Sequence, residues 1–134
     1  MHAEGRCHCG SIRYQAEVDP SRVAICHCTD CQVLTGSPYR VSVVVPAEHF
    51  TLLAGEPKFY VKVAASGNRR AHAFCPECGT PVFARPDADP PLTYTLRIGG
   101  LAQRADLPPQ RQIWCDSSLP WSKDIRALPA SARQ

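Results

Sequence analysis

Apolar and polar residues alternate along several short stretches of the chain, with the period of two that predicts half-buried strands. The clearest stretch runs from Tyr39 to Val45, where aromatic and β-branched residues occupy every second position. Another runs from Ser11 to Val18 and stops at Asp19-Pro20. Similar alternating or short apolar stretches predict further strands at residues 23–25, 50–53, 59–63, 71–74, 80–84, 92–98 and 112–115.

Turn residues interrupt these stretches often. Thirteen prolines and eight glycines disfavour long helices and suit short strands joined by turns. One helical turn is expected, capped by Thr29 or Asp30, carrying Cys31 and ending at Gly36-Ser37-Pro38. The pattern predicts a mainly β fold with little helix and roughly seven to nine short antiparallel strands.

The length and composition are those of one ordinary domain. The chain has 134 residues, of which 44% are apolar and 20% charged, and the sequence contains no internal repeat or linker. We therefore expect a single domain over residues 1–134.

The charge distribution predicts neither a nucleic-acid nor a membrane partner. The net charge is +3, and no run of basic residues is longer than Arg69-Arg70. No apolar run approaches the ~20 residues of a membrane span, and no apolar leader precedes Cys7. A cytoplasmic location is expected, where thiols stay reduced and clustered cysteines indicate metal ligands.

Eight cysteines fall into groups with metal-ligand spacing. Cys7 and Cys9 form a C-x-C pair, and Cys75 and Cys78 form a C-x-x-C pair, each followed by glycine. Together these pairs supply four thiolates, which complete a tetrahedral zinc site. Such a site would tie the N-terminus to a distant part of the chain, so its predicted role is structural.

A third group, Cys26, Cys28 and Cys31, has three thiols in C-x-C-x-x-C spacing. Three ligands leave one zinc position open, which is typical of a catalytic site. A zinc ion there can activate a bound thiol or polarise a carbonyl group. The predicted chemistry is the joining of a small thiol and a small electrophile.

Other assignments of this second site stay open. His27 or Cys115 would close it, the thiols could stay metal-free and reactive, or the site could share ligands with the Cys7 pair. An iron–sulfur cluster is another alternative, although its usual spacings differ. His8 and His27 each sit between two cysteines, and in an extended segment such a side chain points away from the metal.

Residues outside the cysteine groups are candidates for the pocket wall. Trp114 and Trp121 are expected in the core or in a pocket wall, and Ser37 and Tyr39 near the second site. His72 is a weaker candidate for a place beside Cys75. Guanidinium and ammonium groups can hold a substrate carboxylate. Four residues are candidates for this role: Arg40, Lys62, Arg69 and Arg70. The alternative is that each of them is an ordinary surface charge.

Taken together, the motifs resemble one family, the glutathione-dependent formaldehyde-activating enzymes, also called the centromere protein V domain. The resemblance covers nearly the whole chain and includes the order and spacing of all seven motif cysteines. The motifs are Gly5-x-Cys7-x-Cys9-Gly10-x-Ile12, Cys26-His27-Cys28-x-x-Cys31, Thr35-Gly36-Ser37-Pro38, Phe74-Cys75-x-x-Cys78-Gly79-Thr80-Pro81 and Ile113-Trp114-x-x-Ser117-x-x-x-Trp121.

The resemblance implies a β-tent of small antiparallel sheets stabilised by zinc. It implies a structural zinc at Cys7, Cys9, Cys75 and Cys78, and a catalytic zinc at Cys26, Cys28 and Cys31. The implied activity is a carbon–sulfur lyase reaction in which glutathione, the co-substrate, joins formaldehyde to give S-(hydroxymethyl)glutathione. The sequence departs from the usual family pattern at Ala102-Gln103, Gln112 and Cys115, which leaves the electrophile open.

Two functions from different classes therefore remain. The first is a zinc-dependent lyase acting on a thiol adduct of a small electrophile. The alternative is a non-catalytic zinc-binding β domain that serves as a partner-binding module. The sequence does not predict the oligomeric state.

Overall fold

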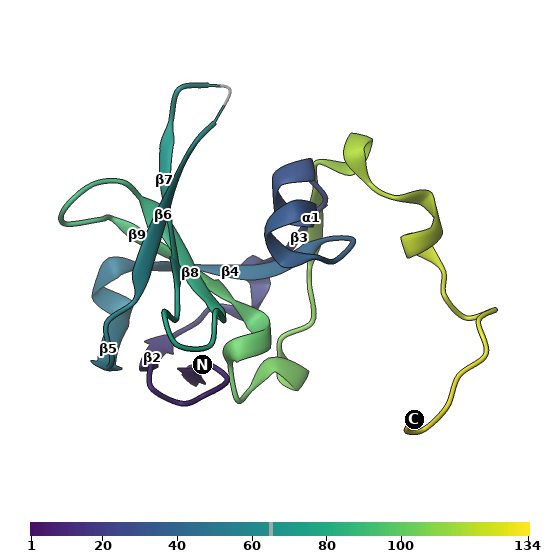
Figure 1. Ribbon diagram of the computed structural model, residues 1–134, viewed down its shortest axis with the longest axis horizontal. Helices are drawn as coiled ribbons and strands as arrows, with labels where there is room; N and C mark the ends of the chain where they lie inside the picture. The colour runs from purple at the N-terminus through teal and green to yellow at the C-terminus, as the bar shows by residue number, and fades with distance from the viewer. Residues whose placement is uncertain (65) are drawn as a thin grey trace.

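A computed structural model describes residues 1–64 and 66–134, which form two β-sheets and one short α-helix (Figure 1). The smaller sheet has three strands in the order β1-β2-β5, all antiparallel. Its strands are β1 (His2–Arg6), β2 (Arg13–Glu17) and β5 (Phe50–Ala54).

The larger sheet has seven strands in the order β10-β3-β4-β9-β8-β7-β6. Its neighbours are antiparallel except for β10, which pairs with β3 in parallel, so the prediction of purely antiparallel strands is wrong at this edge. The strands are β3 (Val23–Cys26), β4 (Arg40–Pro46), β6 (Lys58–Val63), β7 (Arg69–Phe74), β8 (Pro81–Pro86), β9 (Thr93–Arg97) and β10 (Arg111–Ile113).

The two faces of the larger sheet differ sharply in polarity. Because side chains alternate along a strand, residues in register across neighbouring strands share a face. One register row is fully apolar and buried in the core: Val23, Val43, Leu96, Phe83 and Ala73.

The opposite face carries the polar residues, and we call it the cationic face. In the register, Cys26 lies opposite Arg40, Ser42 opposite Arg97, Tyr60 opposite His72, and Lys62 opposite Arg70. The alternation in β4 that directs valines into the core also places Arg40 and Ser42 together on the cationic face.

Helix α1 (Thr29–Thr35) follows β3 after only two residues. Its N-cap is Cys28, whose Sγ accepts a hydrogen bond from the Cys31 backbone N–H at 3.3 Å, so the prediction that Thr29 or Asp30 caps the helix is wrong. The helix ends at Gly36, which has a φ of 60° in the left-handed region that glycine tolerates.

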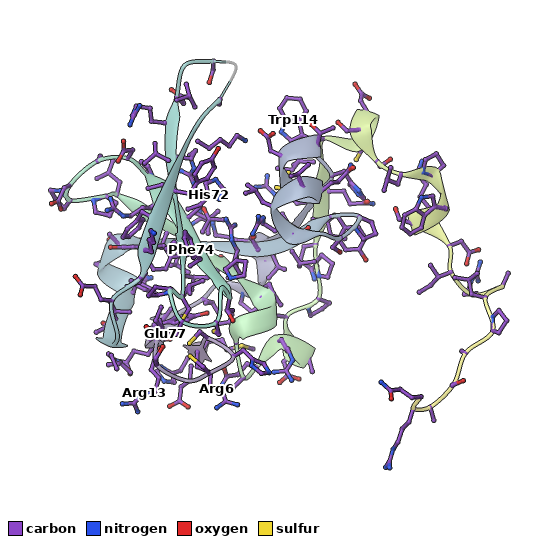
Figure 2. All side chains as sticks on the ribbon, in the orientation of Figure 1. Arg6, Arg13, His72, Phe74, Glu77 and Trp114 are labelled. Atoms are coloured by element: carbon purple, nitrogen blue, oxygen red, sulfur yellow. The ribbon has the colours of Figure 1, made fainter. Side chains whose placement is uncertain are left out.

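After β10 the chain leaves the body of the molecule and ends far from it (Figure 1). Trp114 and Trp121, which were expected in the core or in a pocket wall, lie in this C-terminal segment. They are 65% and 63% exposed, so a place in the core is excluded. Figure 2 shows Trp114 at the outer end of α1, away from the sheet.

The predicted mainly β fold with little helix is confirmed, and each predicted strand is present. Strand β1 was missed, because its inward positions are Ala3 and Gly5 and give no hydrophobic signal. Gly5 is required there by packing, since a Cβ at this position would collide with the Tyr14 ring. Among the described residues, no helix is long and apolar enough to span a membrane.

Candidate functional site

Two turns bring Cys7, Cys9, Cys75 and Cys78 together, and we call this group the four-cysteine cluster. All four Sγ atoms lie within 4.8 Å of one another. The first turn joins β1 to β2 and the second joins β7 to β8, so the cluster connects the two sheets. In Figure 2, sulfur atoms gather between the Glu77 turn and the strands of the smaller sheet.

Tight backbone turns and nearby hydrogen-bond donors hold these thiols close to one another. The Gly79 N–H donates to the Cys75 carbonyl at 2.8 Å, and Gly79 has a φ of 75° that suits glycine. The Ile12 N–H donates to Cys7 Sγ at 3.2 Å. The Thr80 hydroxyl donates to Cys78 Sγ at 3.1 Å, and this bond is the main reason that the pKa of Cys78 is lowered to about 5.

The sulfur spacing of the four-cysteine cluster fits a tetrahedral zinc ion. Zinc–sulfur bonds of ~2.3 Å place tetrahedral sulfurs about 3.8 Å apart. The Sγ atoms of Cys7 and Cys9 are 3.6 Å apart, and those of Cys9 and Cys75 are 3.8 Å apart. The Ser11 hydroxyl lies 3.2 Å from Cys9 Sγ and 3.3 Å from Cys75 Sγ, a contact that the cysteine pattern did not predict.

The end of β3 and the start of α1 bring Cys26, Cys28 and Cys31 together, and we call this group the three-cysteine cluster. Its Sγ atoms also lie within 4.8 Å of one another, and all three residues are half-buried. Cys26 belongs to the strand, Cys28 caps the helix, and Cys31 lies in its first turn. The donor set suits zinc as three of four ligands.

The three thiols lie close enough together to shift one another's pKa. The Cys26 thiol is the main group that lowers the pKa of Cys31 to about 5, against burial, with smaller contributions from Cys28 and Arg40. The same contact raises the pKa of Cys26. The Arg40 guanidinium, which belongs to the residue opposite Cys26 in the register of β3 with β4, also favours the thiolate form of Cys31.

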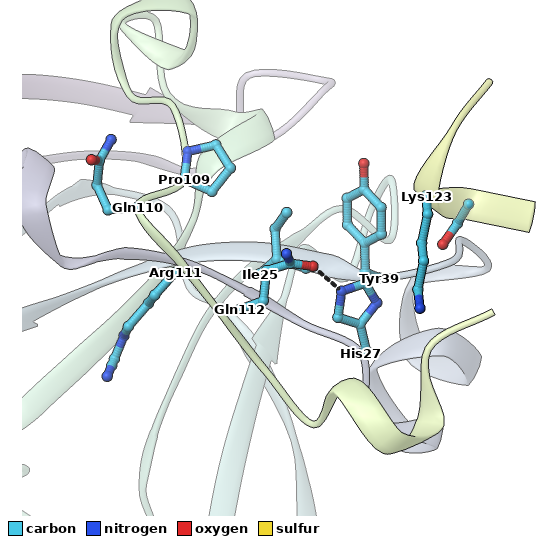
Figure 3. Close-up of a pocket in the computed structure, with 9 residues that line it drawn as sticks. Ile25, His27, Tyr39, Pro109, Gln110, Arg111, Gln112 and Lys123 are labelled. Atoms are coloured by element: carbon cyan, nitrogen blue, oxygen red, sulfur yellow. Dashed lines mark hydrogen bonds between the residues drawn. The ribbon is translucent and has the colours of Figure 1, made fainter. Parts of the chain in front are cut away.

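His27 points away from the three-cysteine cluster, as its position in an extended C-x-C segment predicted. Its Nε2 donates to Gln112 Oε1 at 2.7 Å, and its ring meets the edge of the Tyr39 ring at a centroid distance of 5.4 Å (Figure 3). Both residues line a cavity of about 580 Å³ on that side of β3. Tyr39 therefore lies near the motif but not beside its thiols.

Neither residue proposed to close the three-cysteine cluster joins it. Within the described part of the chain, the thiols group as four and three, without His27 or Cys115. Cys115 is exposed in the C-terminal segment. The grouping also places Cys7 and Cys9 with Cys75 and Cys78, rather than with the central motif.

A small cavity of about 210 Å³ opens on the cationic face. Arg40, Arg97, His72 and Tyr60 line it from the sheet, and Leu34 lines it from α1, one turn beyond Cys31. Arg40 borders this cavity and lies opposite Cys26 in the register of β3 with β4, so the cavity adjoins the three-cysteine cluster. We call it the arginine pocket.

The arginine pocket keeps His72 uncharged. Burial lowers the pKa of His72 to about 4, with further lowering by the nearby Arg97 and Arg40 cations. An Arg97 Nη2–H donates to His72 Nδ1 at 3.2 Å, which leaves the imidazole proton on Nε2. His72, which was expected beside Cys75, instead faces this pocket.

The four cations expected to hold a carboxylate have separate environments. Arg40 lies in the arginine pocket, Lys62 pairs with Asp30 at 2.7 Å, and Arg70 donates to Thr95 Oγ1 at 3.1 Å. Arg69 pairs with Asp87 at 2.9 Å on the surface, so it is no part of the site. Ser37 is exposed and lines none of the cavities described above.

Sequence reasoning missed Arg97, which is only 8% exposed and donates to Ser42 Oγ at 3.1 Å. A signal was present, because alternation from Leu92 to Ile98 places Arg97 on the face opposite Leu96. An arginine at that position of an interior strand needs hydrogen-bond partners or an opposite charge.

The structure predicts that Cys115 and His27 are dispensable for metal binding. Cys115→Ser and His27→Gln should each retain the zinc content of the unaltered chain, because neither side chain reaches a cluster. Metal analysis of the purified variants checks this. A zinc loss in Cys115→Ser, with the fold intact, would show that Cys115 is a ligand.

Comparisons with known proteins agree with this architecture. The family model for the glutathione-dependent formaldehyde-activating enzyme matches residues 2–117. A Schizosaccharomyces pombe protein named as an uncharacterized lyase is 25% identical over 80 residues, which are 60% of this chain and 55% of that protein. The chain thus spans about half the length of this curated relative.

A crystal structure of a Rhodobacter sphaeroides protein has the same fold. It superposes with a TM-score of 0.62 at 18% identity and covers 84% of this chain and 99% of its own. At this identity the likeness concerns the fold alone.

Proposed function

Since this chain belongs to the glutathione-dependent formaldehyde-activating enzyme family, we propose that it is a zinc-dependent carbon–sulfur lyase. Its substrates are a small thiol, with glutathione as the first candidate, and formaldehyde or a similar small electrophile. The lyase name of the Schizosaccharomyces pombe relative supports an enzyme of this class.

One observation carries the proposal, namely the three-cysteine cluster beside the arginine pocket. Cys26, Cys28 and Cys31 converge on one point, while His27 turns to Gln112 on the other side of β3. A metal site with three protein ligands next to a cavity is the arrangement of a catalytic zinc site. The four-cysteine cluster, whose four thiols complete a tetrahedron, takes the structural role.

A zinc ion held by Cys26, Cys28 and Cys31 would lower the pKa of a substrate thiol or polarise a carbonyl group. The chain's own groups prepare the site for this chemistry. The Arg40 guanidinium stabilises the thiolate form of Cys31. The residues that line the arginine pocket would orient the electrophile next to the three-cysteine cluster.

The overall reaction is an addition without oxidation or reduction. The thiol sulfur attacks the carbonyl carbon, the C=O π electrons move to oxygen, and the thiol proton ends on that oxygen. The reverse reaction releases the thiol and the aldehyde. A cytoplasmic location, which supplies reduced thiols, is part of the same proposal.

The alternative function is a partner-binding module without turnover. The exposed Trp114 and Trp121 of the C-terminal segment favour it, because exposed tryptophans are enriched in protein interfaces. The two functions differ in what they require of the three-cysteine cluster, since only the enzyme needs it to accept a small thiol.

Metal analysis combined with glutathione titration tests the proposal. We expect about two zinc ions per chain, one for each cluster, and a zinc in the three-cysteine cluster that chelators remove first. Calorimetric titration of the zinc-loaded protein should show glutathione binding, and removal of the labile zinc should abolish it. One zinc per chain with no binding of any small thiol would exclude the lyase and favour the module.

A further inference from the structure

The arginine pocket holds two buried guanidinium groups that have no acidic partner. Arg40 is 6% exposed and Arg97 is 8% exposed. The Nε atoms of both are buried without a hydrogen-bond partner, and within residues 1–64 and 66–134 no carboxylate oxygen lies within 4 Å of either group. Burying a charge without a partner costs free energy, so a bound anion would stabilise this pair of guanidinium groups.

The neighbouring thiolates supply too little negative charge to balance this face. Four cations contribute to lowering the pKa of His72: Arg40, Arg97, Arg70 and Lys62. Among them, in the part of the chain that the structure describes, only Lys62 has a carboxylate partner, Asp30. A zinc ion with three thiolates carries a single net negative charge, and Arg40, opposite Cys26 in the register, already lies beside it. Arg97 donates only to neutral acceptors, Ser42 and His72.

We propose that the arginine pocket binds the carboxylate group of a substrate, and that the preferred electrophile is a small carboxylate-bearing aldehyde. Guanidinium groups bind carboxylates through paired hydrogen bonds. The His72 Nε2–H adds a neutral donor to the same cavity.

The size of the cavity favours the electrophile over the thiol as the source of the carboxylate. Its volume is about 210 Å³, below the roughly 300–1,000 Å³ of pockets for drug-sized ligands. Glutathione, which also carries carboxylates, is drug-sized, whereas an aldehyde acid of a few atoms fits. The carboxylate would rest on Arg97 while the aldehyde carbon faces the three-cysteine cluster beside Arg40.

The reaction step is the thiol addition already proposed, and this part rests on that proposal. With an aldehyde acid, the thiol sulfur bonds to the aldehyde carbon and the thiol proton moves to the former carbonyl oxygen. The carboxylate does not react. Binding of the carboxylate is independent of turnover and can be measured without a thiol.

Glyoxylate and propionate are suitable probes for the zinc-loaded protein. Calorimetry should show binding of propionate and none of propionamide, which has the same shape and no charge. Arg97→Gln should weaken propionate binding and raise the KM for glyoxylate by roughly 10–100-fold, the loss expected for a charged hydrogen bond. The KM for formaldehyde, which has no carboxylate, should rise by a smaller factor than the KM for glyoxylate.

Two further variants make the result specific. Arg97→Lys keeps the charge and should recover part of the propionate affinity. Arg69→Gln is the matched control. Arg69 lies on the same strand as His72 but pairs with Asp87 on the surface, so this variant should bind propionate normally. Thermal melting of each variant checks that the fold is retained.

Three other outcomes of these measurements would contradict part of the proposal. If Arg97→Gln weakens binding of glutathione but not of glyoxylate, the pocket is a carboxylate site for the thiol. If the unaltered protein turns over formaldehyde yet binds neither propionate nor glyoxylate, the carboxylate site is excluded while the lyase proposal stands. If propionate binds but no electrophile reacts, the lyase proposal fails and the carboxylate site remains.

Discussion

Replacing Cys75 with serine is expected to lower the free energy of unfolding by about 3–4 kcal/mol and to release one zinc ion per chain. Structural zinc contributes ~10–16 kcal/mol in zinc-finger peptides, and the loss is expected to be smaller here because this domain has a buried hydrophobic core of its own. Cys75 is fully buried in the turn between β7 and β8, where it faces Cys9 from the other sheet. Denaturant unfolding followed by metal analysis measures both effects.

A second variant separates the loss of metal from the disturbance of the core. Serine at position 75 would also bury a hydroxyl group, whereas Cys78 is exposed, so Cys78→Ser removes a ligand without changing the core. Both variants should lose one zinc ion per chain and unfold at lower denaturant concentration. Cys115→Ser, an exposed cysteine outside the clusters, should do neither. Normal zinc content and stability in Cys78→Ser would show that the cluster does not hold the fold together.

The parts of the structure that depend on local pattern were predictable from the sequence. Alternation from Tyr39 to Val45 predicts β4, because a half-buried strand needs one apolar face. Pairs such as Cys75 and Cys78, with glycine directly after, predict the tight turns of the four-cysteine cluster. These signals are short-range, and tertiary packing here reinforces them.

The features that the sequence did not reveal depend on contacts between distant strands. Arg40 and Arg97 look like surface charges in sequence, and only the register of β4 with β9 brings them into one buried pocket. Cys28 is the N-cap of helix α1 because its thiol accepts a hydrogen bond from the Cys31 N–H. The usual residue preferences instead favour Thr29 or Asp30 as the cap. Strand β1 is held by pairing with β2 rather than by its own apolar residues.

Gln112 has a structural role beside the central cysteine motif. Gln112 lies on β10 and accepts a hydrogen bond from His27 Nε2, while the His27 backbone N–H donates to the Ile113 carbonyl at 3.1 Å. The parallel strand β10 thereby fixes His27 on the side of β3 opposite the thiols. Gln112 thus helps keep His27 away from the three-cysteine cluster.

Replacing Cys28 with serine should abolish lyase activity while preserving the fold. Serine is a preferred N-cap residue, so its hydroxyl can take over the hydrogen bond from the Cys31 N–H and α1 should still begin at the same residue. A serine hydroxyl is protonated at neutral pH, whereas zinc requires a thiolate. Outer partners of metal ligands already contribute ~10–100-fold to activity, so loss of a ligand should lower kcat/KM by more than about 100-fold.

Zinc content, stability and turnover of Cys28→Ser together decide the role of the three-cysteine cluster. The variant should lose the chelator-sensitive zinc, keep the zinc of the four-cysteine cluster, and unfold within about 1 kcal/mol of the unaltered chain. Cys26→Ser should behave in the same way, because Cys26 approaches the same point from β3. Cys115→Ser is the matched control and should retain full activity. If Cys28→Ser loses this zinc and still joins glutathione to formaldehyde at the normal rate, the three-cysteine cluster is not the catalytic site.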